Sequence, residues 1–311
     1  MSIQAISELK DGDRIDSDFL ITKIEKKKTK TAKTYKAVTL CNATGTIGMN
    51  VWENKYDQLI GVDAEDVVHV IGTKDEYGIK LYKMDRIDPA TVTMTDYYDT
   101  GDKPTIQREF AQILAYIDKV SNPWLQSLLQ SFFLNQNIAE SFMAHSAAKT
   151  IHQAFPGGLV NHSLHVAQIS DFYSSMYPAI NRDLLITAAL LHDIGKTEEL
   201  SDFPANDYTD EGTMLGHIVI GLDMVSQHCA QIQGFPVDLR EELLHCIAAH
   251  HGKLDYGSPV APHIIEAIAL HRADEVDAAL TTASELVSQA TDYQFVVNRA
   301  ANTTLRKTKS T

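Results

Sequence analysis

The chain has 311 residues, of which 44% are hydrophobic and 22% charged, a composition typical of globular proteins with room for about two domains. No apolar run approaches the roughly 20 residues that cross a bilayer, and residues 1–10 lack the basic start and apolar stretch of a secretory signal. The cysteines, Cys41, Cys229 and Cys246, form no metal-type pair and suit a reducing compartment, so we expect a cytoplasmic protein without membrane contact.

The net charge of −14 argues against a protein that coats nucleic acid by bulk charge. Acidic residues are most in excess in the second part: residues 1–104 hold 15 basic and 18 acidic side chains, and residues 105–311 hold 12 and 23. A local exception is the stretch 23–36, with seven lysines and one glutamate. This lysine run is either a solvated face or an edge that contacts phosphates, and the pattern leaves both open.

Residues 12–89 are predicted to form β structure. Alternating or short apolar runs predict five strands, at 19–24, 35–40, 46–52, 66–72 and 79–82. Turn-forming residues separate them at 42–45 and 74–78. Five short strands in this length favour a small barrel, with a short helix in 55–64. We therefore assign residues 1–90 to an all-β barrel domain.

The pattern changes after residue 90. Residues 91–104 are polar and unpatterned, which indicates a linker. Helical periodicity then dominates, and no strand signal of comparable strength follows. We expect an all-α domain over 105–300 and a short mobile basic tail at 301–311. The expected helices are 105–120, 123–134, 137–147, 159–176, 181–194, 213–232, 237–249, 261–280 and 283–297.

An adjacent His192-Asp193 pair ends one of these apolar helices and offers a divalent metal one nitrogen and one oxygen ligand. Gly195 follows as an expected C-terminal cap. Lys196 stands where it can meet an anion bound to that metal, although a cation at a helix C-terminus has a second explanation in the helix dipole.

Other histidines and an aspartate occur at similar helix positions. A lone histidine on a helix is more often a partnered core or surface residue, so only the set is informative. His165, one turn after His162, is expected to support that residue. Nitrogen and oxygen ligands without cysteine suit Mn, Fe, Mg or Zn. Seven side chains exceed what one ion commonly takes, which favours two ions bridged by Asp193. The set consists of His162, His192, Asp193, His217, His250, His251 and Asp274.

The order of His162, the His192-Asp193 pair and Asp274 along the chain resembles the HD-domain metal-dependent phosphohydrolase superfamily. The additional His217 and the pair His250-His251 resemble its two-metal branch. The strings at 157–163, 215–218 and 249–259 are similar to those of the YhaM-type 3′-5′ exoribonucleases. The strands and turns at 13–15, 35–40 and 44–52 resemble that family's nucleic-acid-binding OB-fold. The likeness covers roughly residues 10–285, and after about residue 287 we find no clear match.

This resemblance implies a metal-dependent 3′-5′ exoribonuclease that hydrolyses single-stranded RNA, and single-stranded DNA as a second substrate, to nucleoside 5′-monophosphates. It implies one ion at His162, His192 and Asp274, a second at His217, His250 and His251, and Asp193 between them; manganese is the first choice, with Fe, Co, Mg and Zn as others. Asp193 and Lys196 would be catalytic. The strand would contact Lys26, Lys27, Lys28, Lys30, Lys33, Tyr35, Trp52 and Tyr77.

Two other hypotheses remain open. An HD phosphohydrolase could act on free nucleotides or cyclic dinucleotides, but such substrates need no nucleic-acid-binding barrel. A nucleic-acid-binding regulator could carry an inactive HD domain, but the complete ligand set argues against it. A homo-oligomer is a further expectation from the resemblance.

Overall fold

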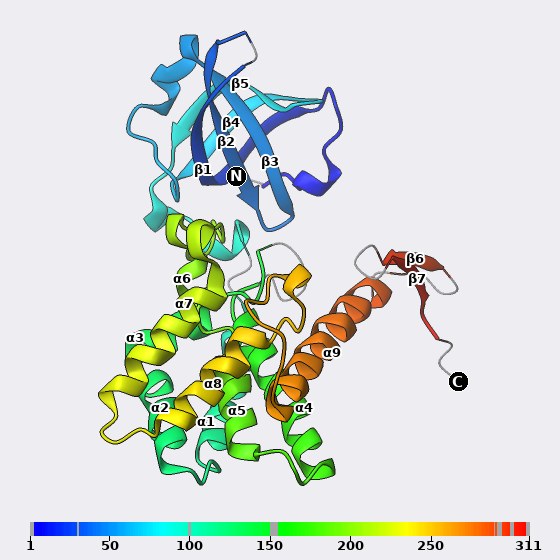
Figure 1. Ribbon diagram of the computed structural model, residues 1–311. Helices are drawn as coiled ribbons and strands as arrows, with labels where there is room; N and C mark the ends of the chain where they lie inside the picture. The colour runs from blue at the N-terminus through cyan, green and yellow to red at the C-terminus, as the bar shows by residue number, and fades with distance from the viewer. Residues whose placement is uncertain are drawn as a thin grey trace. The chain divides into compact units, whose positions relative to one another are not determined.

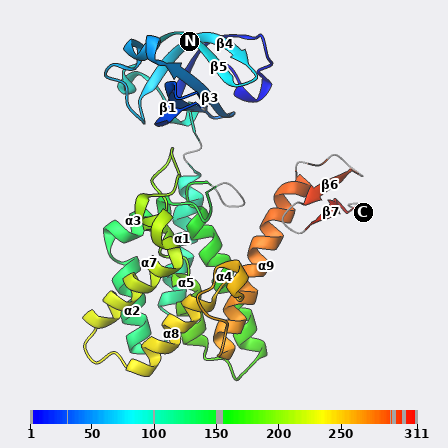
Figure 2. The same ribbon diagram turned by 45° about the horizontal axis from the view of Figure 1, so that its top comes forward.

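The computed structural model describes residues 3–29, 31–98, 101–149, 155–288, 290, 294–298 and 302–308. The chain divides into two compact units, Met1–Thr100 and Gly101–Thr311 (Figures 1 and 2). The first is a β barrel and the second is built mainly of helices, so each is described by itself.

The first unit is a closed five-stranded barrel, as the sequence predicts. The strand order is β1-β2-β3-β5-β4, with β4 pairing back onto β1. The β3–β5 contact is parallel and the other neighbours are antiparallel. A 3-10 helix, η2 (Glu53–Leu59), follows the third strand, close to the predicted helix. The strands are β1 (Arg14–Lys28), β2 (Thr34–Asn42), β3 (Gly45–Trp52), β4 (Val67–Asp75) and β5 (Gly78–Arg86).

Alternating side chains fill the barrel. On β2, Val38 and Leu40 point inward and are at most 1% exposed, and their neighbours face outward. The parallel contact that closes the barrel depends on Gly78, because a Cβ there would lie 2.0 Å from the Gly48 carbonyl oxygen. The apolar interior and the two turns explain why the barrel could be recognised from its sequence pattern.

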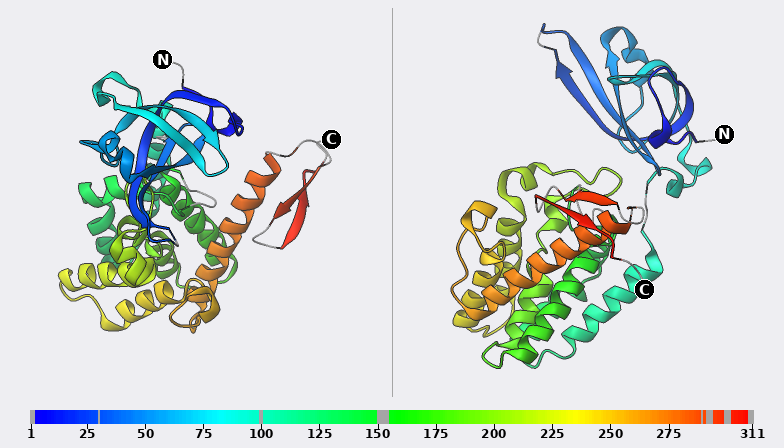
Figure 3. Two further views of the ribbon diagram at one scale, coloured as in Figure 1. Left: turned by 90° about the horizontal axis from the view of Figure 1, so that it is seen from above. Right: turned by 90° about the vertical axis from the view of Figure 1, so that its right-hand side faces the viewer.

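The second unit contains the long helices. Helix α5 is buried at every position from Leu184 to Leu191, so it forms the centre of this unit. Helices α4 and α9 pack against it and against each other (Figure 3). Side chains cap several helix starts, for example Asn181 before α5 and Thr209 before α7. The helices are α1 (Lys103–Ile117), α2 (Pro123–Phe133), α3 (Gln136–Ala144), α4 (Gly158–Met176), α5 (Arg182–Leu191), α6 (Lys196–Glu199), α7 (Asp210–Gln231), α8 (Val237–Ala249) and α9 (Ile265–Ser288).

The structure departs from the predicted ends of the second domain. Helix α9 stops at Ser288, and two strands, β6 (Phe295–Asn298) and β7 (Thr303–Arg306), form an antiparallel hairpin at its end (Figures 1 and 3). The expected helix at 283–297 is thus confirmed only as far as Ser288, and residues 303–306 of the expected tail at 301–311 form a strand. Residues 301 and 309–311 of that tail lie outside the described residues. Each strand has four residues, which is too short for a period-2 pattern to stand out.

The predicted linker at 91–104 is also partly folded. Two 3-10 helices, η3 (Pro89–Thr91) and η4 (Met94–Asp96), lie at its start, and α1 begins at Lys103. Tyr97 is 2% exposed and packs with Leu20 and Cys41 of the barrel. A single aromatic anchor gives no periodicity, so sequence patterning could not detect it. Within the described residues, none of the helices is long and apolar enough to cross a membrane.

Candidate metal centre

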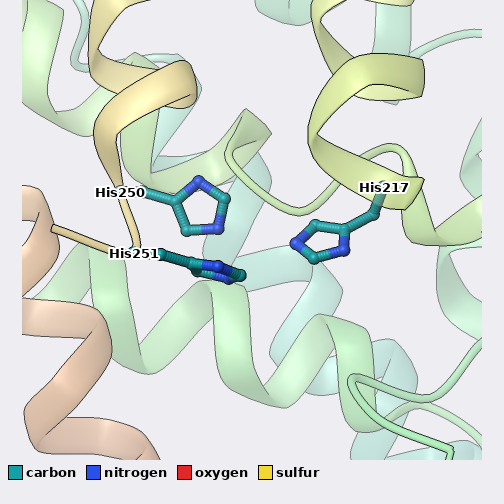
Figure 4. Close-up of side chains that lie close together, drawn as sticks. All are labelled: His217, His250 and His251. Atoms are coloured by element: carbon teal, nitrogen blue, oxygen red, sulfur yellow. The ribbon is translucent and has the colours of Figure 1, made fainter. Parts of the chain in front are cut away.

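The seven predicted ligands come from five places in the helical unit, and the fold brings them together. His162 lies in α4, His192 and Asp193 directly follow α5, and the others come from α7, the end of α8 and α9. Their nitrogen and oxygen atoms fall into three groups, each with all ligand atoms within 4.8 Å of one another. The groups are His162, His192 and Asp193; His192, His250 and Asp274; and His217, His250 and His251, the last drawn in Figure 4.

Glycines allow the backbone to make this approach. Gly195 has helical torsion angles rather than the left-handed cap conformation that the sequence suggested. A Cβ at Gly195 would lie 2.1 Å from the His217 carbonyl oxygen, so the glycine permits α7 to pack against the His-Asp turn. Gly216 interrupts α7 with φ 74° and ψ 157°, and His217 therefore starts a new turn that faces Asp193.

The five histidines share one orientation. Each places its Nδ1 beside a carbonyl or carboxylate oxygen, which places a proton on Nδ1 and turns Nε2 toward the centre. The bonds are His162 to Asp277 Oδ2 at 2.7 Å, His192 to Ala189 O at 2.9 Å, His217 to Glu199 Oε1 at 3.1 Å, His250 to Ile247 O at 2.6 Å and His251 to Tyr256 O at 2.8 Å.

The two oxygens of Asp193 face different histidines. Oδ2 lies 3.4 Å from His192 Nε2 and 3.5 Å from His162 Nε2. Oδ1 lies 3.4 Å from His217 Nε2 and 3.7 Å from His250 Nε2. The Asp193 side chain is 3% exposed, so this carboxylate is held between two sets of imidazoles away from bulk water.

Three buried atoms at this point have lone pairs and no hydrogen-bond partner among the described residues: Asp193 Oδ1, His217 Nε2 and His250 Nε2. Buried acceptors without donors are costly, and a cation satisfies all three. The residues therefore fit a divalent metal site.

Lys196 points at the same centre. Its Nζ donates to Asp193 Oδ2 and to the Ala147 carbonyl oxygen, both at 2.6 Å. Burial favours the neutral amine, but the negative charge of Asp193 outweighs it and raises the pKa of Lys196. The ammonium is thus kept charged beside the site.

Burial and the neighbouring charges also shift the pKa values of the proposed ligands. Burial lowers the pKa of His250 and that of His251, so both imidazoles stay neutral and able to bind metal. Burial also opposes ionisation of Asp193, but Lys196 and His192 lower the pKa of this carboxyl well below its usual range. For His162, burial acts against the charged form, yet hydrogen bonds to Asp274 and Asp277 raise its pKa to about 9.

Two supporting carboxylates were missed by sequence reasoning. Asp277, 5% exposed, accepts from His162 through Oδ2 and from His165 through Oδ1 at 2.9 Å. The expected support from His165 thus acts through this shared carboxylate. Glu199 accepts from both the backbone N–H and the Nδ1 of His217. An acidic residue in a helix usually marks a solvated face; the only signal was that Asp277 lies one turn after Asp274.

On the barrel, the structure brings the three predicted aromatics together. Tyr35, Trp52 and Tyr77 line one cavity of about 590 Å³, whose wall also includes Lys55 and Lys80. The rings of Tyr35 and Trp52 lie 5.1 Å apart with an interplanar angle of 40°. Trp52 is 42% and Tyr77 75% exposed, so these rings are accessible for stacking.

Of the predicted lysines that the structure describes, three lie at the end of β1 and Lys33 lies just before β2. Lys26, Lys27 and Lys28 are exposed, and Lys27 pairs through Nζ with Glu25 Oε2 at 3.0 Å. Because Lys27 is opposite Tyr35 in the sheet, it shares the face of the aromatic rings, whereas its two neighbours lie on the other face. Lys33 lines a second hollow beside Trp52. Lys30 lies outside the described residues.

Comparisons with known proteins agree with this description of the helical unit. Residues 159–279, which hold all seven predicted ligands, match the HD domain family. The fold and site therefore define a two-part protein, a closed five-stranded barrel followed by a helical unit with an HD domain, whose histidine and aspartate cluster could hold a divalent metal.

The curated relatives identify the family more closely. The chain is 32% identical to the 3′-5′ exoribonuclease YhaM of Bacillus velezensis and 31% identical to that of Bacillus subtilis, in each case with 86% of both chains covered. It is 30% identical to the YhaM of Oceanobacillus iheyensis, over 91% of this chain and 90% of the relative. The chain belongs to the YhaM family of 3′-5′ exoribonucleases. No solved structure matches it significantly.

Proposed function

We propose that this chain is a metal-dependent 3′-5′ exoribonuclease that hydrolyses single-stranded RNA to nucleoside 5′-monophosphates. The observation that carries the proposal is the buried Asp193 carboxylate, whose two oxygens face two separate sets of imidazoles. The relatives that cover most of the chain bear the same activity in their name.

The donor set supports two ions. His162, His192 and Asp274 would hold one, His217, His250 and His251 the other, and Asp193 would contribute one oxygen to each. Imidazole and carboxylate ligands suit manganese first, with iron, cobalt, magnesium and zinc as other candidates. When bound, such ions make hydroxide available near neutral pH and offset the charge of the phosphate.

The chain's own groups do the remaining work. The Nδ1 hydrogen bonds hold each imidazole with Nε2 toward the centre, so little reorganisation is needed when phosphate arrives. The Lys196 ammonium, held charged beside Asp193, would donate to a phosphate oxygen as negative charge builds there.

The barrel would hold the strand. Base stacking on Tyr35, Trp52 and Tyr77 tolerates any sequence and requires unpaired bases, which favours single-stranded substrates. The exposed lysines of β1 would contact phosphates. Stacking and phosphate contacts do not require the 2′-hydroxyl, so single-stranded DNA is included as a second substrate.

The cytoplasm as location is supported by the three free, buried cysteines. A homo-oligomer is proposed from the resemblance to the YhaM family.

The test is cleavage of a 5′-labelled oligoribonucleotide by the full chain in Mn²⁺, with EDTA as the control. We expect a ladder that shortens one nucleotide at a time, release of nucleoside 5′-monophosphates, and no reaction in EDTA. Turnover of free nucleotides alone, or strand binding without turnover, would refute the proposal.

A further inference from the structure

A small cavity opens directly beside the metal centre, between the 3-10 helix η5 (Leu254–Tyr256) and α9. Its volume is about 280 Å³, near the lower end for small-molecule sites. The walls are His251, Tyr256, His271, Asp274 and Glu275. Since His251 and Asp274 belong to the proposed ligand set, a group in this cavity lies next to the ions.

The turn that carries Tyr256 is rigid. The Tyr256 carbonyl accepts from His251 Nδ1 at 2.8 Å, so one hydrogen bond fixes the ligand and the tyrosine together. Ser258, 3% exposed, donates through Oγ to the Ala248 carbonyl at 2.9 Å and closes the turn. Gly252 has a φ of +76°, and a Cβ there would lie 2.3 Å from His271 Nε2, so the turn also packs tightly on α9.

The Tyr256 side chain itself has no role in the core, because it is 59% exposed. Lys253 Nζ lies over the ring, 5.0 Å from its centroid, and brings a positive charge to one of its faces. A rigid aromatic ring at the wall of a cavity, with a cation nearby, suits a planar heterocycle attached to an anion.

We propose that this cavity receives the 3′-terminal nucleoside of the strand, with its base stacked on Tyr256. This inference rests on the proposed exonuclease function. In that reaction a water oxygen bonds to phosphorus, the bond from phosphorus to the preceding 3′-oxygen breaks, and that oxygen takes a proton. The terminal nucleoside stays attached to the phosphate through its 5′-oxygen, so it must lie within one ester linkage of the ions, where the cavity is.

The experiment compares two 5′-labelled oligoribonucleotides that differ only at the last residue, a normal adenosine or an abasic ribose. The first cleavage in Mn²⁺ is timed for the full chain. The unaltered protein should cleave the abasic strand about tenfold more slowly, since it lacks the stacked base. Tyr256→Ala should slow the normal strand by a similar factor and cleave the abasic strand at the unaltered protein's rate. Tyr256→Phe, which keeps the ring, should behave as the unaltered protein.

Tyr177→Ala is the matched control, because Tyr177 is 56% exposed and follows α4; it should change neither rate. If Tyr256→Ala keeps the tenfold preference for the normal strand, or slows both strands equally through His251, the inference is wrong. A second readout is the affinity of the Mn²⁺-loaded protein for adenosine 5′-monophosphate, which Tyr256→Ala should weaken about tenfold. If the unaltered protein cleaves neither strand, the proposed function fails, and the inference falls with it.

Discussion

The barrel and the helical unit present their polar and aromatic side chains in opposite ways. Trp52 and Tyr77 of the barrel are 42% and 75% exposed, whereas His192 and His250 of the centre are fully buried. Exposed groups contribute separately and in small amounts. Buried polar groups depend on one another, because removing one leaves its partners unsatisfied. Substitutions should therefore have graded effects on the barrel and steep effects at the centre.

The steepest effect is expected at Asp193, since both imidazole sets face this carboxylate. Asp193→Ala, and the isosteric Asp193→Asn, should abolish cleavage of a labelled oligoribonucleotide and leave most of the strand binding, which we assign to the barrel. Circular dichroism would confirm that the variants fold. Turnover near the normal rate in the asparagine variant would refute the proposed role of the carboxylate.

A smaller loss of activity is expected at Asp277, which accepts a hydrogen bond from the proposed ligand His162. In Asp277→Asn the amide keeps only one acceptor oxygen for two imidazoles, His162 and His165, so His162 loses its fixed orientation. The Mn²⁺ concentration needed for half-maximal rate should rise about 10- to 100-fold. His165→Gln leaves the His162 bond intact and serves as the control. An unchanged Mn²⁺ requirement in Asp277→Asn would show that the shared carboxylate does not orient His162.

On the barrel, the effect should appear in salt dependence. Lys26, Lys27 and Lys28 are exposed, and replacing all three with glutamine should reduce the slope of log affinity against log salt by about 0.7 for each phosphate contact that is lost. Cleavage at saturating RNA should be unaffected. Because Lys27 alone shares the face of Tyr35, Lys27→Gln should weaken binding more than Lys26→Gln. An unchanged slope in the triple variant would remove these lysines from the strand-binding surface.

The smallest expected effect is the release of protons when Mn²⁺ binds. In the metal-free chain the pKa of His162 is raised to about 9, so this imidazole is protonated at pH 7.5 and must lose its proton to bind metal. Mn²⁺ affinity should therefore increase with pH up to about 9 and then level off. Calorimetry at pH 7.5 in buffers of different ionisation enthalpy should detect about one proton released per molecule. Equal heats in all buffers would contradict the assignment.

The two units also differ in what their sequences could reveal. The barrel follows from inward alternation on β2 and from turns at residues 42–45, and both are local. The seven predicted ligands could be named because helix ends with His-Asp and His-His pairs recur in a recognisable order. Their convergence is a tertiary property that no local pattern contains.

The features that escaped prediction share a physical cause. Asp277 and Glu199 resemble ordinary helix-surface acids until the fold buries them against histidines. Gly195 resembled a helix cap, but its role is the close approach of α7. The hairpin β6–β7 is too short for its alternation to be distinguished from a continuing helix.

The most direct test of the account is anomalous X-ray scattering from crystals of the full chain soaked in Mn²⁺. The account predicts two manganese peaks flanking the Asp193 carboxylate, one beside His162 and His192 and the other beside His217 and His250. Manganese only at other sites, or none at Asp193, would contradict the claim that this cluster is the catalytic metal centre.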